Sequence, residues 1–432
     1  MTLALWTLGG VLLAGMLLRM PIGFSMLASG VAYLIVKRQD LGLLAEQVGN
    51  GLYNSYVLLA VPLFVFAANV MNAGTVSERI FDFCRVVVGR LRGGLAQVDI
   101  LVSVIFSGMS GSAIADAAGP GLVTIRAMLS KPEYSPGFAG AVVVASATLG
   151  PMIPPSIPMV IYALVSGASV GALFLGGVVP GGLMALLMML VVHVIATKRN
   201  MPREDKVPFA AWPGIAWRGA LPLSMPIVLL GGIYSGAFTP TEAAAVAALH
   251  ALLLAGVVYR ALSWRSLYGV LLESTRASAV ITIVLAGSFI LNYAFTAEGV
   301  PQAVAQWVET LHLIRLQFLL MVNLLFLVLG CFLDVSVLLL VFVPMLLPAV
   351  KVLGIDLVHF GVLVVLNMMI GLITPPFGML LFVTKALTGI PIGAMLREGW
   401  IFFAMLLALL LAMTLFPQIV LWLPQMVGYG VT

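Results

Sequence analysis

Charged residues are scarce in this sequence. Asp, Glu, Lys and Arg make up 9% of the 432 residues, whereas a soluble domain carries about 25%. Hydrophobic residues make up 62%, and the mean hydropathy is +1.17. Because no soluble fold can bury this much apolar surface, the composition excludes a soluble enzyme or binding domain and predicts a protein surrounded by the lipid bilayer.

Cysteine and histidine are also rare. Cys84 and Cys331 lie in apolar or amphipathic stretches, which indicates neither a disulfide framework nor a metal site. The four histidines show no metal-ligand spacing, and the sequence contains no Walker A pattern and no convincing nucleophile–base arrangement. The sequence therefore predicts that this chain is not an enzyme and does not hydrolyse ATP.

Long apolar runs are what the sequence holds in quantity. A helix needs about 20 apolar residues to cross roughly 30 Å of hydrocarbon, and runs without alternation favour helices over a barrel. The first run is not a signal peptide, because it lacks a basic start and Arg19-Met20-Pro21 is not a small-residue cleavage site. We expect an all-α polytopic membrane protein. The apolar runs include residues 3–18, 57–70, 142–165, 170–197, 277–295 and 401–423.

Lysine and arginine gather in short loops. Lys37 and Arg38 form one cluster, and residues 198–206 hold another. Such clusters are typical of cytoplasmic loops, although a solvated loop explains each of them equally well, so the membrane orientation stays open. The net charge of +5 therefore indicates no nucleic-acid partner.

The two halves of the chain resemble each other at a shift of about 221 residues. A polar segment, residues 198–218, separates a predicted first repeat (1–197) from a second (219–432). Matching interrupted helices in two membrane halves are typical of secondary transporters, whose substrate site lies between the repeats. The matched stretches are residues 20–23 with 239–242, 108–112 with 330–334, 136–140 with 357–361, and 150–155 with 371–376.

Each half contains a segment rich in glycine and serine inside an apolar region. Residues 106–120 hold three Gly, three Ser and a Pro, and polar backbone at membrane depth is tolerated only where it lines a cavity or is buried in protein. We predict re-entrant hairpins at about 106–130 and 329–350, with tips near 107–112 and 330–336. Close helix packing through small residues is the alternative.

Each half also contains a Pro-Pro pair inside an apolar run. Two prolines in series unwind a helix, which frees carbonyls for a cation and presents a helix N-terminus to an anion. We predict broken helices at about 138–165 and 360–387, with 150–156 and 371–376 as ion and substrate cradles. A kink without a ligand is the alternative for each.

Acidic residues in apolar surroundings are functional candidates, because burying them in a membrane is costly. Asp334 lies in the second predicted tip and suits Na⁺ or H⁺, since hard cations choose oxygen ligands. Asp116 is either a ligand or a brace of its hairpin, and Glu242 reads as a helix-start acid. Lys385 either pairs with a substrate carboxylate or extends to the membrane interface.

At these motifs the chain resembles the large (M) subunit of tripartite ATP-independent periplasmic (TRAP) transporters, the DctM-like family. The resemblance implies an elevator-type transporter with two inverted repeats and Na⁺ as the coupling ion. It implies a first ion site at Ser107, Gly108, Ser110 and Ser112 with the first broken helix, and a second at Gly330, Asp334 and Thr374. The resembling stretches are residues 106–119, 150–157, 173–181, 236–245, 354–361 and 371–378.

The resemblance also implies partners. A small Q-type membrane subunit is expected as a separate chain, and a P-type periplasmic binding protein delivers the substrate at the bacterial cytoplasmic (inner) membrane. The substrate is an organic acid: a C4-dicarboxylate, sialic acid or another sugar acid. On electrostatic grounds we place it between the tips and the breaks, because no arginine lies in the tips and helix N-termini, hydroxyls and cations must hold its charge. The residues predicted to bind it are Ser110, Pro154, Ser156, Thr374 and Pro375.

Two other classes of transport protein remain as alternatives. A stand-alone Na⁺- or H⁺-coupled organic anion carrier of the same superfamily would need no binding protein. A channel could place the same breaks and acidic tip along a pore, although alternating access explains paired breaks better.

Overall fold

The computed structural model describes residues 2–206, 208, 210 and 212–428, and within them every regular element is a helix. Seven of the described helices are long and apolar enough to cross a membrane. The chain is therefore a multi-pass membrane protein, as its composition predicts. Several further apolar helices are shorter than a full span, and most of these belong to the interrupted segments described below.

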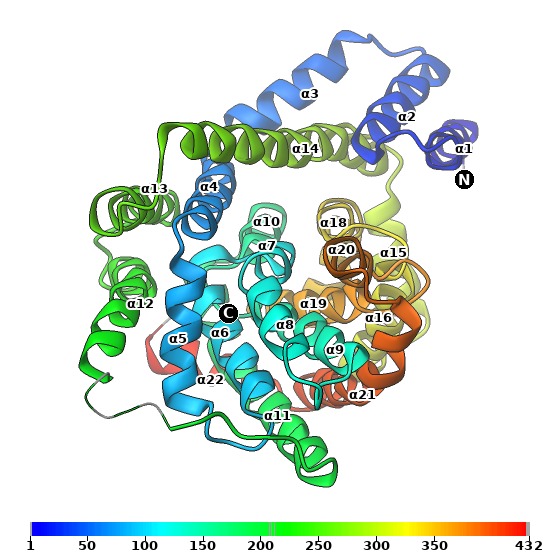
Figure 1. Ribbon diagram of the computed structural model, residues 1–432. Coiled ribbons are helices and arrows are strands. Elements are labelled where there is room, and N and C mark those ends of the chain that lie inside the picture. Colours follow the sequence, from blue (N-terminus) through cyan, green and yellow to red (C-terminus); the bar gives the residue numbers. More distant parts are fainter. Residues whose placement is uncertain (1, 207, 209, 211, 429–432) are drawn as a thin grey trace.

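The helices form two groups in Figure 1: one lies along the top and left of the view and is here called the outer group, and the other fills most of the rest and is called the inner group. The longest helix, α14, runs along one edge and packs against α2, α3 and α4, while α13 packs against both α4 and α12. The outer group comprises α1 (Leu3–Leu17), α2 (Ile22–Lys37), α3 (Gly42–Tyr53), η1 (Tyr56–Leu59), α4 (Ala60–Ala73), α12 (Trp212–Tyr234), α13 (Pro240–Leu252), η4 (Leu253–Val258) and α14 (Trp264–Ala297).

The inner group contains the glycine- and proline-interrupted segments of both halves. From the first half come α6 (Gly94–Ser110), α7 (Ala113–Ala118), α8 (Pro120–Leu129), α9 (Pro136–Ser146), η2 (Ala147–Leu149), α10 (Ile157–Ser166) and α11 (Val170–Lys198). From the second half come α16 (Arg315–Gly330), α17 (Val335–Val337), η5 (Leu338–Phe342), α18 (Val343–Val352), α19 (Leu357–Leu372), α20 (Met379–Thr388), α21 (Ile392–Leu415) and α22 (Gln418–Met426).

Two amphipathic helices lead into these segments, α5 (Val76–Val88) before α6 and α15 (Val300–Thr310) before α16. In the first half α6 turns at residues 111–112, and α8 returns to pack against α6. In the second half α16 ends at Gly330, and the chain continues after residues 331–334 through α17, η5 and α18. Both turns lie inside the predicted tips, but the first arms begin at Gly94 and Arg315 rather than near residues 106 and 329, because the apolar sequence before each tip is helical throughout.

The broken helices follow in each half. α9 and η2 end at Leu149, residues 150–156 are non-helical, and α10 begins at Ile157. α19 ends at Leu372, residues 373–378 are non-helical, and α20 begins at Met379. Both breaks contain the Pro-Pro pairs, and both pairs have a cis peptide bond.

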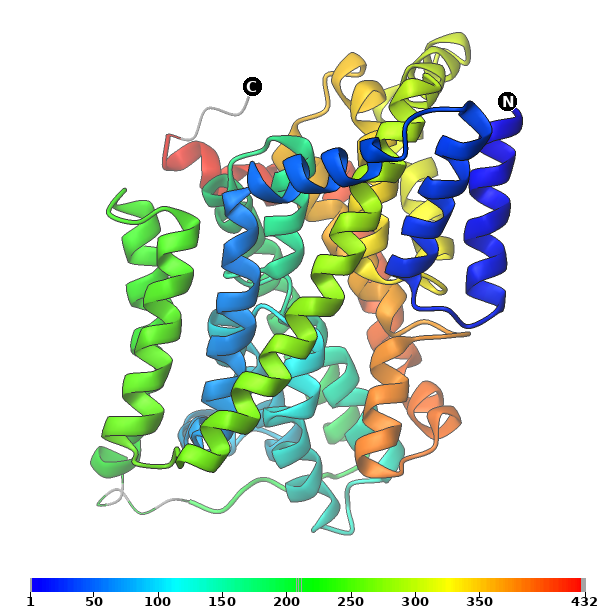
Figure 2. The same cartoon turned by 90° about the horizontal axis from the view of Figure 1, so that it is seen from above.

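The linker between the halves is shorter than the predicted 198–218. α11 continues to Lys198, and α12 already begins at Trp212. Residues 207, 209 and 211 lie outside the described part of the chain. The described part of the linker up to residue 206 crosses one end of the bundle (Figure 2).

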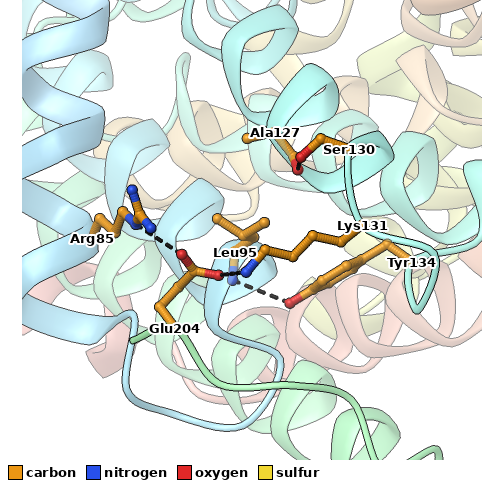
Figure 3. A network of polar contacts seen from close by, with 7 residues as sticks. All are labelled: Arg85, Leu95, Ala127, Ser130, Lys131, Tyr134 and Glu204. Atoms are coloured by element: carbon orange, nitrogen blue, oxygen red, sulfur yellow. Dashed lines mark hydrogen bonds and ion pairs between the residues drawn. The ribbon is translucent and has the colours of Figure 1, made fainter. Parts of the chain in front are cut away.

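The first part of this linker is anchored by a buried carboxylate. Only 2% of the Glu204 side chain is exposed, and it forms ion pairs with Arg85 on α5 (2.7 Å) and with Lys131 between α8 and α9 (Figure 3). The Glu204 amide donates to the Gly89 carbonyl (2.9 Å). The two residues are close: a Cβ atom added to Gly89 would lie 3.2 Å from the Cβ of Glu204. A segment that reads as a solvated linker is therefore fixed to the base of the first hairpin.

The two basic clusters lie at opposite ends of the bundle. Lys37 pairs with Glu298 (2.5 Å) at the end of α14, whereas the linker cluster lies at the end where α14 begins (Figure 2). The two basic clusters cannot both lie in cytoplasmic loops, because the Lys37–Glu298 ion pair holds Lys37 at the end of the bundle opposite the linker.

Candidate functional site

The first hairpin tip is a tight turn between two helices. α6 ends at Ser110, Gly111 adopts a left-handed conformation (φ 61°), and the Ser112 hydroxyl caps α7 by accepting from the Ala115 amide (3.3 Å). Glycine tolerates positive φ without a steric penalty. The Ser107 hydroxyl donates to the Ser103 carbonyl (2.5 Å) one turn earlier.

This tip touches the break of the first broken helix directly. The Ile157 amide donates to the Gly111 carbonyl (3.4 Å). A Cβ atom on Gly111 would lie 2.4 Å from the Pro155 carbonyl oxygen, and one on Gly150 would lie 3.0 Å from the Ser112 backbone. The structure therefore brings together the predicted residues of the first tip and those of the first break.

Buried oxygen atoms without partners lie on this hairpin. The Ser110 hydroxyl lacks a hydrogen-bond partner among the described residues, although Ser110 is 0% exposed. Both carboxylate oxygens of Asp116, which is 1% exposed, accept no hydrogen bond of ordinary geometry, although the Ser103 hydroxyl and the Asp99 carboxylate lie nearby. Buried polar groups are normally paired, and a buried carboxylate is especially costly without a partner. Hydroxyl and carboxylate oxygens are the donor set of a hard cation, so these residues fit Na⁺. The Ser156 hydroxyl, in contrast, is fully engaged, since it donates to the Pro151 carbonyl and caps α10.

The second tip is centred on Asp334. Its side chain caps α17 by accepting from the Ser336 amide (2.8 Å). Asp334 and Gly330 line a cavity of about 220 Å³, which also includes Phe377 and Gly378 from the second break. A Cβ atom on Gly371 would lie 2.8 Å from the Gly330 backbone. The second tip therefore also contacts the broken helix of its own half.

Thr374 and Pro375 line a different cavity. It has a volume of about 180 Å³ and apolar walls from α9, α20 and α21. The Thr374 hydroxyl donates to the Ile370 carbonyl (2.5 Å). Thr374 therefore does not share a cavity with Asp334 in this structure, although both belong to the predicted second ion site.

The halves meet crosswise in the middle of the inner group (Figure 1). After the first tip α7 packs against α20, which follows the second break, and α10 packs against α17, η5 and α18 of the second hairpin. Both tips and both breaks are therefore gathered in one region, and each tip is continuous with a helix that packs against the other half.

The remaining charged candidates are placed differently. Glu242 forms a capping box with Thr239 at the start of α13, which confirms its reading as a helix-start acid. Lys385 is exposed on α20.

Sequence reasoning missed a buried polar cluster behind the first tip. Asp99 on α6 is 1% exposed and accepts hydrogen bonds from Thr124 on α8 and from Ser146 on α9 (2.6 Å for the latter). A lone carboxylate in an apolar stretch is the same signal that identified Asp116, and it would have found Asp99 as well.

Comparison with known proteins identifies the family. The sequence profile described as "Tripartite ATP-independent periplasmic transporter, DctM component" matches residues 10–419. The chain belongs to this family.

Relatives of this TRAP chain are large permease subunits. It is 40% identical over 423 residues to the sialic acid TRAP transporter large permease protein SiaM of Vibrio cholerae, covering 98% of both chains. It is 40% identical over 373 residues to the C4-dicarboxylate TRAP transporter large permease protein DctM of Pseudomonas aeruginosa, covering 86% of this chain and 87% of that one. The chain is therefore a TRAP transporter large permease subunit, and its relatives are permeases rather than enzymes.

Solved transporters share the fold. The YdaH transporter of Alcanivorax borkumensis superposes with a TM-score of 0.62 at 15% identity, covering 90% of this TRAP chain and 89% of its own. The MtrF structure of Neisseria gonorrhoeae gives a TM-score of 0.51 at 13% identity, covering 89% and 83%. At this identity the likeness concerns the fold alone.

Proposed function

We propose that this TRAP large permease subunit moves an organic acid across the bacterial inner membrane together with Na⁺. The observation that carries the proposal is the set of unpartnered oxygens on Ser110 and Asp116, buried in a hairpin whose tip contacts a helix break. A cation beside the Ser110 hydroxyl would supply the partner that this atom lacks, and a cation near Asp116 would offset the charge of its carboxylate.

The two ion sites follow from the two halves. Ser107, Gly108, Ser110 and Ser112 would surround the first Na⁺, and Asp116 is the buried carboxylate on the same hairpin. Asp334 would hold the second Na⁺ beside Gly330, and Thr374 would join it only if the break shifts, since that residue now faces another cavity. Bound Na⁺ supplies positive charge where the protein has none, because no Lys or Arg lines either cavity.

The arrangement of elements supports inverted repeats and elevator transport. Each half runs through an amphipathic helix, a hairpin and a broken helix in the same order, with a tip-to-break contact in each. In an elevator mechanism the inner group would move as a body against the outer group, which holds long helices such as α14. The inner group contains all candidate ligands, so ions and substrate would move with it.

An organic acid is the substrate class that fits. Relatives of the chain are named for sialic acid, C4-dicarboxylate, 2,3-diketo-L-gulonate and isethionate. The predicted contacts place the acid between Ser110, Pro154 and Ser156 of one half and Thr374 and Pro375 of the other. In this structure Ser110, Pro154 and Ser156 are buried, so opening of the crosswise contact between the halves would precede binding.

The distribution of basic residues supports an orientation. Connections at the linker end hold several Lys and Arg, whereas at the other end the α10–α11, α12–α13, α15–α16 and α18–α19 connections hold none and the α2–α3 connection holds Arg38 next to Lys37 (Figure 2). Cytoplasmic loops are the basic ones, so the linker end would face the cytoplasm and the opposite end the binding protein. The basic residues at the linker end include Arg90, Arg92, Lys131, Arg199, Arg203, Lys206 and Arg260.

A labelling experiment tests this orientation. Asp205→Cys places a thiol on the exposed linker, and Glu309→Cys places one on α15. In intact cells a membrane-impermeant maleimide is expected to label Glu309→Cys and to label Asp205→Cys only after permeabilisation. The two native cysteines are buried, so the wild-type protein is the blank. The reverse pattern would overturn the orientation.

Reconstitution tests the partners. Proteoliposomes with this chain, a small Q-type membrane subunit and an inward Na⁺ gradient are expected to take up the organic acid only when a P-type periplasmic binding protein is added. The physical reason is that the two cavities offer no Lys or Arg, so capture of a dilute anion is left to the binding protein. Uptake of free substrate at the same rate without it would favour the stand-alone carrier.

A further inference from the structure

A fully buried carboxylate joins three helices of the first half behind the ion site. Asp99 lies on α6, the first arm of the hairpin. Its Oδ1 accepts from the Thr124 hydroxyl on α8, the second arm, and its Oδ2 accepts from the Ser146 hydroxyl on α9 (2.6 Å). One side chain therefore ties both arms of the hairpin to the broken helix.

The second half has a corresponding contact. Asn367 on α19 donates to both the backbone carbonyl (2.9 Å) and the side-chain oxygen (3.2 Å) of Asn323 on α16. Asn323 in turn donates to the Thr414 hydroxyl on α21 (2.8 Å). Ser146 and Asn367 are separated by the same shift as Pro154 and Pro375. In both halves, then, a buried polar residue on the first hairpin arm is bonded to an equivalent position on the broken helix.

We infer that Asp99 is a positioning residue for the first ion site. It fixes the hairpin against the broken helix, so that tip and break keep the spacing at which their oxygens form one ligand set. Asn323 and Asn367 do the same for the second half. The inference rests on the proposed Na⁺ coupling and adds residues that are not among the proposed ligands of the ion or the substrate.

The position of the bridge explains why it matters. Asp99 lies three helical turns before the tip on a helix whose far end carries Ser107 and Ser110, and Ser146 lies just before the break at 150–156. Among the described residues, the only other side-chain hydrogen bond between α6 and the start of α9 joins the Leu95 amide to the Tyr134 hydroxyl (3.2 Å), at the end of α6 far from the tip. Without the bridge, apolar contacts would hold the rest of the two helices, and these resist sliding less than a directional hydrogen bond does. A small shift between the helices would spread the ligands and weaken the binding of a cation that requires several oxygens at once.

The test measures the Na⁺ concentration for half-maximal uptake in proteoliposomes with the small subunit and the binding protein present. Asp99→Leu, which removes both hydrogen bonds, is expected to raise this concentration by at least about tenfold, since one lost charge-assisted hydrogen bond already corresponds to that factor. Uptake should recover at saturating Na⁺. Asp99→Asn should rescue most of the Na⁺ affinity, because its carboxamide can accept from one hydroxyl and donate to the other.

The matched control is Asn69→Leu. It removes a partly buried hydrogen bond of similar length, from Asn69 on α4 to Ser274 on α14 (2.9 Å), in the outer group. This variant is expected to lower the melting temperature and leave the half-saturating Na⁺ concentration unchanged.

The outcomes separate the inference from the proposed function. If Asp99→Leu loses stability but keeps the wild-type half-saturating Na⁺ concentration, Asp99 is a packing residue and the inference is overturned. If Asp99→Leu does not fold, Ser146→Ala, which removes one of the two hydrogen bonds, takes its place. A smaller increase in the half-saturating Na⁺ concentration supports the inference, and an unchanged concentration overturns it. Wild-type uptake without any Na⁺ dependence would instead refute the proposed function.

Discussion

Alanine in place of Gly371 is expected to abolish Na⁺-driven uptake. The added Cβ would lie 2.8 Å from the Gly330 backbone, and a main chain, unlike a flexible side chain, cannot rotate away. The second tip would have to move from the break, carrying Asp334 with it. Gly371 lies within α19, where alanine favours the helix by about 1 kcal/mol, so any loss of transport comes from the displaced tip rather than from the helix itself.

Gly182→Ala is the control for this variant. Gly182 is also a helical glycine of the inner group, but its added Cβ would meet no atom within 4 Å. Uptake by reconstituted protein should be normal in Gly182→Ala and at background in Gly371→Ala. Normal uptake in Gly371→Ala would mean that the close contact of tip and break is not needed for transport.

Asparagine in place of Asp334 is the second change with a large expected effect. The substitution removes one negative charge beside a bound Na⁺, which at an effective dielectric constant near 20 corresponds to about 4 kcal/mol at 4 Å before solvent screening. Because Asp334 is only half-buried, we expect a loss of about a hundredfold in Na⁺-dependent uptake rather than the full value. Expression should be close to normal.

Asp356→Asn controls for the structural role of Asp334. Both aspartates cap a helix: Asp356 accepts from the Val358 and His359 amides at the start of α19. Asparagine is an equally good N-cap, so both variants keep the cap and lose the charge. Only Asp334→Asn should lose Na⁺-driven uptake, measured with an imposed gradient. Equal uptake in the two variants would remove Asp334 from the ion site.

Local sequence patterns predicted the positions of the turns well. The tips and breaks lie where Gly, Ser and Pro interrupt apolar runs, because these residues act on the backbone within a few positions of themselves. The lengths of the arms were not predicted, since nothing marks where an apolar helix begins when the residues before it are also compatible with a helix. α6 begins at Gly94 and α16 at Arg315 for this reason.

Contacts between distant segments could not be predicted in the same way. Asp99 and Ser146 are 47 residues apart, and no local pattern links them. Thr374 was grouped with Asp334 because both match the family motif, yet the two line different cavities, since the wall that Thr374 faces comes from α9 and α21. Glu204 reads as one charge in a polar linker, and only the fold shows that its carboxylate is buried.

The burial of Glu204 has a consequence for the order in which the protein is made. Arg85 and Lys131 are synthesised long before Glu204, so the base of the first hairpin lacks the carboxylate between them until the linker has left the ribosome. Every member of this cluster precedes residue 212, so its assembly requires no part of the second half. The first half can therefore complete its charge pairing at the membrane surface while the second half is still being translated.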